Sequence, residues 1–235
     1  MANESGKSLV CFICGQEIVG EYYYDQYGNN ICNRHSNVPL CFCCGRFCDS
    51  NALVISPERH ICSNCQERQI EMKYVRLIVT YIYYIYEQKG LRFPKYDVTL
   101  LTVSEMIIQS NRNEYTYPLG LAERRGENYH VYVLGLLSRI GFVNTLAHEI
   151  MHIWQWHKKV KMPLQLSEGL SEFGSYFVMK SMMNDMPTEE ARVSISNILN
   201  NRDEIYGDGF RYWKGIYDQG GWKAVVNVID SYKNG

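Results

Sequence analysis

The sequence has no cysteine after Cys65, although nine cysteines occur up to that point. A secreted protein held by disulfides would rarely confine its bridges to one end of the chain. The N-terminal stretch from Met1 to Ser8 is polar and lacks the apolar segment of an export signal. We therefore expect reduced thiols and a cytoplasmic protein. The change in composition predicts a domain boundary near Gln66.

The sequence also lacks a long apolar run and an excess of charge of either sign. Its most apolar run, residues 75–86, has 12 residues and includes Arg76, whereas a membrane-spanning helix needs about 20. The formal net charge is −1, which provides no basic field for a phosphate backbone. Neither a membrane nor a nucleic acid is an expected partner. An apolar content of 46% over 235 residues indicates a globular protein of one or two domains.

What the N-terminal region does contain is a series of paired metal ligands, each pair separated by two residues. The pairs are Cys11 and Cys14, Cys32 and His35, Cys41 and Cys44, and Cys62 and Cys65. In both halves, 17 residues separate one pair from the next. Zinc prefers four thiolate or imidazole ligands in a tetrahedron, and this spacing lets two side chains reach one ion. The spacing predicts two structural zinc sites, which would supply folding energy to a module with little core.

Two successive fingers of this kind are typical of a LIM domain, here over residues 11–66. The ligand order departs from the usual LIM pattern because His35 follows Cys32. Five residues, rather than two, separate the fingers. We therefore interpret the module as LIM-like. Such a module either docks a protein or acts as a structural brace, and the sequence leaves both roles open.

A few residues near the zinc ligands fall outside the pattern. Residues 1–10 are expected to be disordered. Cys43 and Cys48 do not fit the paired spacing and are interpreted as free buried thiols. His60 is interpreted as a surface or packing histidine rather than a ligand.

The rest of the chain, residues 67–235, predicts a mainly helical α+β domain with a small antiparallel sheet. Residues 66–88 carry apolar side chains at helical spacing and predict one long helix. Strands are expected at residues 96–103, 119–124 and 129–134, the last two joined by a turn at 125–128. The strand 129–134 is expected to bind an extended peptide along its edge.

A second helix is expected from Ser138, a candidate N-cap. Its apolar stripe comprises Ile140, Val143, Ala147, Ile150, Met151 and Trp154. The same helix carries the pattern H-E-x-x-H from His148 to His152. Residues four apart share one helix face, so both imidazoles can bind one zinc ion. Glu149 borders that face and is expected to act as general base toward a zinc-activated water.

The third ligand of this catalytic zinc can be compared under two rules. The longer pattern H-E-x-x-H-x-x-G-x-x-H fails because Gln155 and Lys158 occupy the glycine and histidine positions, and His157 is out of register. The other rule takes a glutamate from the next helix, which predicts Glu168 as the ligand. Glu172, one turn later, is expected to orient a ligand histidine.

Two further features of the catalytic domain follow from the sequence. Gly169 and Gly174 cost helix stability, so they predict a close approach of helices beside the zinc. Hydrolysis of a peptide also needs a donor to the developing oxyanion. The sequence does not choose among five candidates: His130, His157, Tyr176, Tyr206 and Tyr212.

With these elements in order, the chain resembles the ubiquitin-activated LIM-domain peptidases that limit organ growth in plants. The resemblance extends from about Cys11 to the C-terminal helices. It is carried by the order of Cys32 and His35, the stretch Pro39–Cys44, Leu134-Gly135-Leu136 leading into Leu146-Ala147-His148-Glu149, Glu168-Gly169, and Gly207-Asp208-Gly209-Phe210-Arg211. It implies a gluzincin-type peptidase that clips proteins, with His148, His152 and Glu168 on zinc and Glu149 as base.

The chain departs from that family in two respects. Larger members carry ubiquitin-interacting helices and a further LIM domain upstream, whereas this sequence starts at the LIM-like module, so ubiquitin is not an expected partner. Family members carry an amide near position 172, where this chain has Glu172. The expected role of Glu172 is therefore particular to this chain.

The sequence as a whole predicts a zinc-dependent endopeptidase that acts on protein or peptide substrates. Three zinc ions per chain are expected, one catalytic and two structural, with the LIM-like module docking a substrate or a regulator. The alternative from another class is a non-catalytic or latent zinc-stabilised interaction module. The intact Glu149 argues against permanent inactivity, because an inert scaffold would not need the base.

Overall fold

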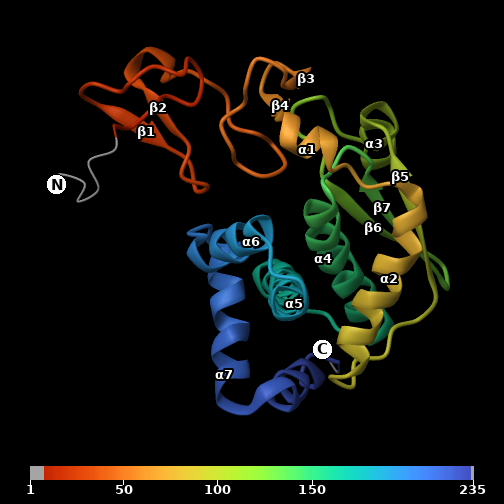
Figure 1. The fold of residues 1–235 in the computed structure, drawn as a ribbon. Coiled ribbons are helices and arrows are strands. Elements are labelled where there is room, and N and C mark those ends of the chain that lie inside the picture. The colour runs from red at the N-terminus through yellow and green to blue at the C-terminus, as the bar shows by residue number, and fades with distance from the viewer. Residues whose placement is uncertain (1–7, 234–235) are drawn as a thin grey trace. The chain divides into compact units, whose positions relative to one another are not determined.

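The computed structural model describes residues 8–233 and has an α+β fold (Figure 1). The chain divides into two compact units, Met1–Arg68 and Gln69–Gly235. The division lies close to the composition change at Gln66. Within residues 8–233, no helix combines the length and the apolarity needed to cross a bilayer.

The ordered structure of the first unit begins before Cys11. Residues 1–7 of the expected disordered segment lie outside the described residues. Val10, however, pairs with Glu17 in a β-bridge, and Leu9 accepts a backbone hydrogen bond from Ile18. The expectation of disorder as far as residue 10 is therefore wrong at its C-terminal end.

The first unit contains the same local structure twice. In each half a β-hairpin leads into a cysteine that is the N-cap of a short helix, and this helix carries the next candidate ligand. Cys32 and His35 have these positions in the first half, and Cys62 and Cys65 in the second. The elements are β1 (Tyr22–Tyr24), β2 (Asn30–Cys32), η1 (Asn33–His35), β3 (Leu53–Ser56), β4 (Arg59–Ile61) and α1 (Ser63–Glu67).

One buried carboxylate joins the two halves. Asp25 is 7% exposed, and its carboxylate accepts the backbone N–H groups of Tyr27 in its own half and of Phe47 in the other. The Tyr27 hydroxyl also donates to the Cys44 carbonyl at 3.1 Å, and the Arg46 guanidinium lies 3.5 Å from the Tyr27 ring centroid. A buried carboxylate is stabilised only when it is well hydrogen-bonded, so this arrangement holds the fingers in one relative orientation.

The second unit contains a three-stranded sheet in the order β5-β7-β6. β5 (Tyr96–Leu101) runs parallel to β7 (Asn128–Leu134), and β6 (Gly120–Arg125) runs antiparallel to it. The expected antiparallel sheet is therefore wrong, because the sheet is mixed. A parallel pair needs a crossover connection, and α3 (Val103–Ser110) begins that crossover.

The position of β7 also corrects the expected peptide-binding edge. β7 is hydrogen-bonded on both sides, so it has no free edge for a peptide. Within residues 8–233, the strand beside the metal-ligand helix that keeps an unpaired edge is β6. The predicted hairpin of β6 and β7 is itself confirmed, with Gly126 and Glu127 as the connecting residues.

The single long helix expected over residues 66–88 is interrupted. α1 ends at Glu67, and α2 begins at Met72 and runs to Glu87. Between them, Gln69 pairs with Ser138 in a β-bridge and the Ile70 N–H donates to the Leu137 carbonyl. These tertiary hydrogen bonds take the backbone out of the helical path, which local periodicity does not reveal.

The helix that carries H-E-x-x-H is as predicted. α4 (Arg139–His157) begins after Ser138, whose hydroxyl accepts the Gly141 N–H at 3.2 Å. All six residues of the expected apolar stripe are buried. α4 ends at His157, before Pro163, and Pro163 instead caps α5 (Leu164–Asp185).

Close backbone contact fixes how α5 packs against α7 (Tyr206–Asp230). A Cβ on Gly169 would collide with the backbone of Gly209, and a Cβ on Gly209 would collide with the Gln165 carbonyl. A Cβ on Gly174 would collide with the Met151 side chain of α4. The expected close approach of helices at Gly169 and Gly174 is therefore confirmed. α6 (Glu189–Asn200) connects this pair, and α7 bends at Gly220–Gly221 (Figure 1).

Replacing Gly209 with alanine should destabilise the second unit by about 1–3 kcal/mol, since the new methyl group would overlap backbone atoms that cannot move independently. The matched control is Gly215→Ala on the same helix, where a Cβ meets no atom within 4 Å. This control should raise stability by about 0.5–1 kcal/mol through helix propensity. Denaturant unfolding followed by tryptophan fluorescence reports on this unit, because all four tryptophans lie after residue 69. Equal effects of the two changes would contradict the packing described.

Candidate metal centres

Among residues 8–233, three groups of side chains each place their metal-binding atoms within 4.8 Å of one another. They are Cys11, Cys14, Cys32 and His35; Cys41, Cys44, Cys62 and Cys65; and His148, His152 and Glu168. Each group has the membership predicted from the sequence. Each of the three groups could hold a metal ion.

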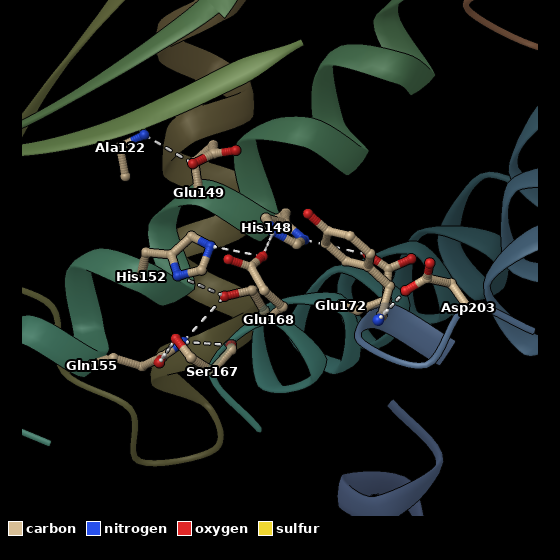
Figure 2. Close-up of polar contacts among 11 residues, drawn as sticks. Ala122, His148, Glu149, His152, Gln155, Ser167, Glu168, Glu172 and Asp203 are labelled. Carbon is tan, nitrogen blue, oxygen red and sulfur yellow. Dashed lines mark hydrogen bonds and ion pairs between the residues drawn. The ribbon is translucent and has the colours of Figure 1, made fainter. Parts of the chain in front are cut away.

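The third group has the donor spacing of a tetrahedral site. Glu168 Oε2 lies 3.2 Å from His148 Nε2 and 3.4 Å from His152 Nε2 (Figure 2). Ligands about 2.1 Å from a central ion at tetrahedral angles lie about 3.4 Å apart. Two nitrogens and one carboxylate oxygen suit a divalent transition metal. The residues present therefore fit such an ion.

The position of the group leaves one side accessible. His148 and His152 lie one turn apart on α4, and Glu168 lies in the second turn of α5, so two helices supply all three ligands. The three side chains retain 14–18% exposure. A closed structural site needs a fourth protein ligand, whereas a site with three ligands and an accessible side is typical of catalysis.

A second carboxylate orients His148. Glu172 Oε2 lies 3.2 Å from His148 Nδ1, on the opposite side of the ring from Glu168. Burial disfavours the charged imidazole, but hydrogen bonds to both carboxylates raise the pKa of His148 to about 10. Burial raises the pKa of Glu168, but the hydrogen bonds to the two imidazoles lower it to about 2. Without a metal, the site is therefore expected to hold a proton that a divalent ion must displace.

His152 is oriented by a hydroxyl and an amide that the sequence did not reveal. Ser171 Oγ lies 3.3 Å from His152 Nδ1, and the Gln155 side-chain amide donates to Ser171 Oγ at 3.1 Å. Ser167 Oγ in turn donates to Gln155 Oε1 at 2.7 Å. Gln155 and Ser171 are almost fully buried. Their spacing of three residues from His152 and from Glu168 is the signal that could have identified them, because residues three apart share a helix face.

Glu149 points away from the three ligands and toward the sheet (Figure 2). Its Oε2 accepts the backbone N–H of Ala122 in β6 at 2.8 Å. The absence of a side chain at Gly120 makes room for this carboxylate, because a Cβ there would lie 2.8 Å from Glu149 Cγ. α4 therefore packs directly against the open edge of β6, with Glu149 between them.

The ligands lie in a cleft of about 500 Å³. Arg112 and Trp156 also line it, and neither was predicted. Of the five candidate oxyanion donors, Tyr206 is the one that lines the cleft. The other four have contacts elsewhere: His130 with Thr99, His157 with Tyr129, Tyr176 with Phe210, and Tyr212 with Trp213.

Tyr206 is held at the start of α7. Its ring centroid lies 6.3 Å from that of His148, and its backbone N–H donates to Asp203 Oδ1 at 2.9 Å. Gly207 packs against the Asn201 carbonyl with no room for a Cβ. Partial desolvation in the cleft, together with the negative charge of Glu168, raises the pKa of the Tyr206 hydroxyl. The hydroxyl therefore stays protonated and can donate a hydrogen bond.

The two cysteine-rich groups also have suitable geometry. His35 Nδ1 lies 3.4 Å from Cys11 Sγ and 3.3 Å from Cys32 Sγ. In the second group, Cys44 Sγ and Cys62 Sγ are 3.7 Å apart, close to the ~3.8 Å expected for two thiolates on one tetrahedral ion. Burial raises the pKa of Cys11, but backbone N–H donors, first that of Cys32, lower it to about 6. The Cys11 thiolate is thus available to a metal near neutral pH.

The residues expected to lie outside the ligand sets remain outside them. Cys48 is buried as predicted, whereas Cys43 is only half-buried. His60 lies in β4 opposite Val54.

Comparison of the chain with protein-family models, with curated proteins and with solved structures found no match. The function of the metal centre is therefore inferred from its own geometry.

Removal of one ligand separates the roles of the two glutamates. Glu168→Ala should lose one metal ion per chain, because two imidazoles alone bind a divalent ion weakly. Glu172→Ala should retain the full content and lower affinity by about 10- to 100-fold. Elemental analysis after gel filtration, followed by chelator competition, measures both. Loss of a metal ion in Glu172→Ala and not in Glu168→Ala would exchange the two roles.

Proposed function

We propose that the protein is a zinc-dependent endopeptidase of the gluzincin type, with two structural zinc ions in its LIM-like unit. The observation that carries the proposal is the convergence of two imidazoles and one carboxylate on a single point in an open cleft, with Glu149 adjacent. Zinc bound by His148, His152 and Glu168 would act as a Lewis acid and would lower the pKa of a bound water to about 7.

Glu149 is the proposed general base. It follows a metal ligand directly and lines the cleft, yet it is not one of the three converging ligands. A carboxylate in that position can accept a proton from the attacking water and deliver it to the leaving amine. The Ala122 N–H and the space left by Gly120 keep the carboxylate between α4 and β6.

The substrate backbone is proposed to lie along β6. The Ala122 N–H points away from β7 and into the cleft, and Gly120 and Leu121 line the cleft beside it. An extended peptide added to such an edge forms main-chain hydrogen bonds whatever its sequence. This arrangement suits a loop or tail of a protein, because an endopeptidase must bind chain on both sides of the scissile bond.

Tyr206 is the proposed donor to the oxyanion. It lines the same cleft as Glu149, and its hydroxyl remains protonated because partial desolvation and nearby carboxylates raise its pKa. A donor aimed at a developing negative charge stabilises the transition state more than the ground state.

The LIM-like unit is proposed to dock a protein substrate or regulator. Exposed apolar side chains support this role, because three of them, Tyr23, Tyr24 and Leu40, line one hollow, and apolar side chains that lie together often mark interaction sites. The exposed apolar side chains are Val10, Phe12, Val19, Tyr22, Tyr23, Tyr24, Leu40, Leu53 and Val54. If the catalytic proposal fails, a zinc-stabilised interaction module is the function that remains.

Glu149→Gln should reduce cleavage of a proteome-derived peptide library by at least about 100-fold, because a neutral amide cannot accept the proton. Zinc content should be unchanged. The matched control, Glu127→Gln, changes an exposed glutamate in the β6–β7 turn and should cleave like the parent protein. Mass spectrometry of the digests would also report the residues preferred around the cleaved bond. Equal cleavage by Glu149→Gln and the parent would exclude the mechanism, and no cleavage by either would favour the interaction module.

Tyr206→Phe should lower kcat by about 100- to 1,000-fold, as loss of one oxyanion donor does elsewhere. KM and zinc content should change little, because the ring and its packing remain. Tyr212→Phe, which removes a hydroxyl on the same helix outside the cleft, is the control. Steady-state kinetics on a peptide identified in the library would measure both, and an unchanged kcat in Tyr206→Phe would remove this residue from the mechanism.

A further inference from the structure

A second hollow, of about 260 Å³, lies on the second unit where α5 and α7 meet the end of α2. It shares no lining residue with the metal cleft. Three lysines from three different segments line it: Lys89 just after α2, Lys180 on α5 and Lys214 on α7. The fold, rather than a local run of basic sequence, brings them together.

The hollow is strongly cationic for this chain. Its lining has three lysines and one acidic residue, Asp218, although the whole chain has a net charge of −1. Asp218 Oδ2 lies 2.6 Å from Lys214 Nζ, on the next turn of the same helix. Lys89 and Lys180 have no carboxylate within ion-pair distance among residues 8–233. Two positive charges therefore face the hollow without a counter-charge.

Three aromatic side chains, Tyr176, Phe177 and Tyr217, also line the hollow. Lys89 Nζ lies 5.5 Å from the ring centroid of Phe177, and Lys180 Nζ lies 5.8 Å from that of Tyr176. Tyr217 packs against Phe177 with ring centroids 6.0 Å apart. An ammonium group over a ring face is attracted to it, so the rings help to hold both lysines beside the hollow.

These features define the chemistry of a ligand. Ammonium groups bind phosphate oxygens as point charges, and aromatic walls accommodate a planar ring. The volume is slightly below the ~300–1,000 Å³ of drug-sized ligand pockets, so it admits one ring and one anionic group but no dinucleotide. We propose that this hollow is a binding site for a small phosphate monoester that carries a single planar ring. The proposal is independent of peptidase activity, because it uses none of the residues of the metal cleft.

Isothermal titration of the full-length, zinc-loaded protein with phenyl phosphate in 150 mM NaCl tests the site. We expect saturable binding with one site per chain, and at least fivefold weaker binding of inorganic phosphate, which lacks the ring. Phthalate provides a ring with two carboxylates. If phthalate binds more tightly than phenyl phosphate, the proposed phosphate specificity is wrong.

Three variants locate the binding. Lys89→Ala combined with Lys180→Ala should raise the Kd for phenyl phosphate at least tenfold. Asp218→Asn should lower the Kd severalfold, because it releases Lys214 from its only described ion pair. A gain in affinity cannot be explained by misfolding. Lys223→Ala, which removes a lysine of α7 that does not line the hollow, should leave the Kd unchanged.

Two further results would overturn the proposal. One is the absence of saturable binding of phenyl phosphate to the parent protein. The other is an equal loss of affinity in Lys223→Ala and in the Lys89/Lys180 double variant, since this would show only a response to total charge.

Discussion

One oxygen of Glu168 lies close to two imidazole nitrogens, and the helix packing of the second unit is what brings these three groups together. Three ligands from two helices can converge only if α4 and α5 cross closely and in one register. Gly174 permits that crossing by leaving room for Met151 of α4. Gly169 then allows α7 to approach α5 from the other side, at Gly209. The glycines therefore help to determine where the ligands lie.

The two units differ in the size of their apolar cores. In the second unit, a large apolar core surrounds the ligands, and buried partners such as Ser171 and Gln155 hold the imidazoles in place. In the first unit, a small core around Ile31 and Phe47 accompanies eight potential metal ligands. A module with so little apolar burial would draw folding energy from metal ions bound at these ligands. Asp25 adds a buried polar connection that joins its halves.

Much of the metal site could be predicted from the sequence, because metal-ligand spacing is a local property. His148 and His152 follow from the helical period, and the paired knuckles follow from their two-residue spacing. Glu168 lies on another helix. Its prediction as a ligand depends on the failure of the longer histidine pattern and on the family resemblance. Tyr206 could not be chosen from nineteen tyrosines, since its place in the cleft depends on how α7 packs against α5.

The wrong predictions of the sheet order and of the long helix also concern features that depend on tertiary contacts. The order of the sheet depends on the crossover that α3 begins. The capping box of α3, formed by Thr102 and Glu105, follows directly on a run of residues that favours a strand. The break before α2 depends on hydrogen bonds to Leu137 and Ser138, far along the chain. Residue patterns within a short window do not report such tertiary contacts.

The Ala122 N–H at the edge of β6 holds Glu149, and the same N–H is available to a peptide that binds along this edge. In a peptidase of the kind proposed, a substrate carbonyl that reaches this N–H must displace the carboxylate, so binding of the chain and release of the base become one event. A small chelating molecule that reaches the metal alone would leave Glu149 held against the strand. Occupancy of the metal and readiness of the base are then separate properties, and only a ligand long enough to cover the strand changes both.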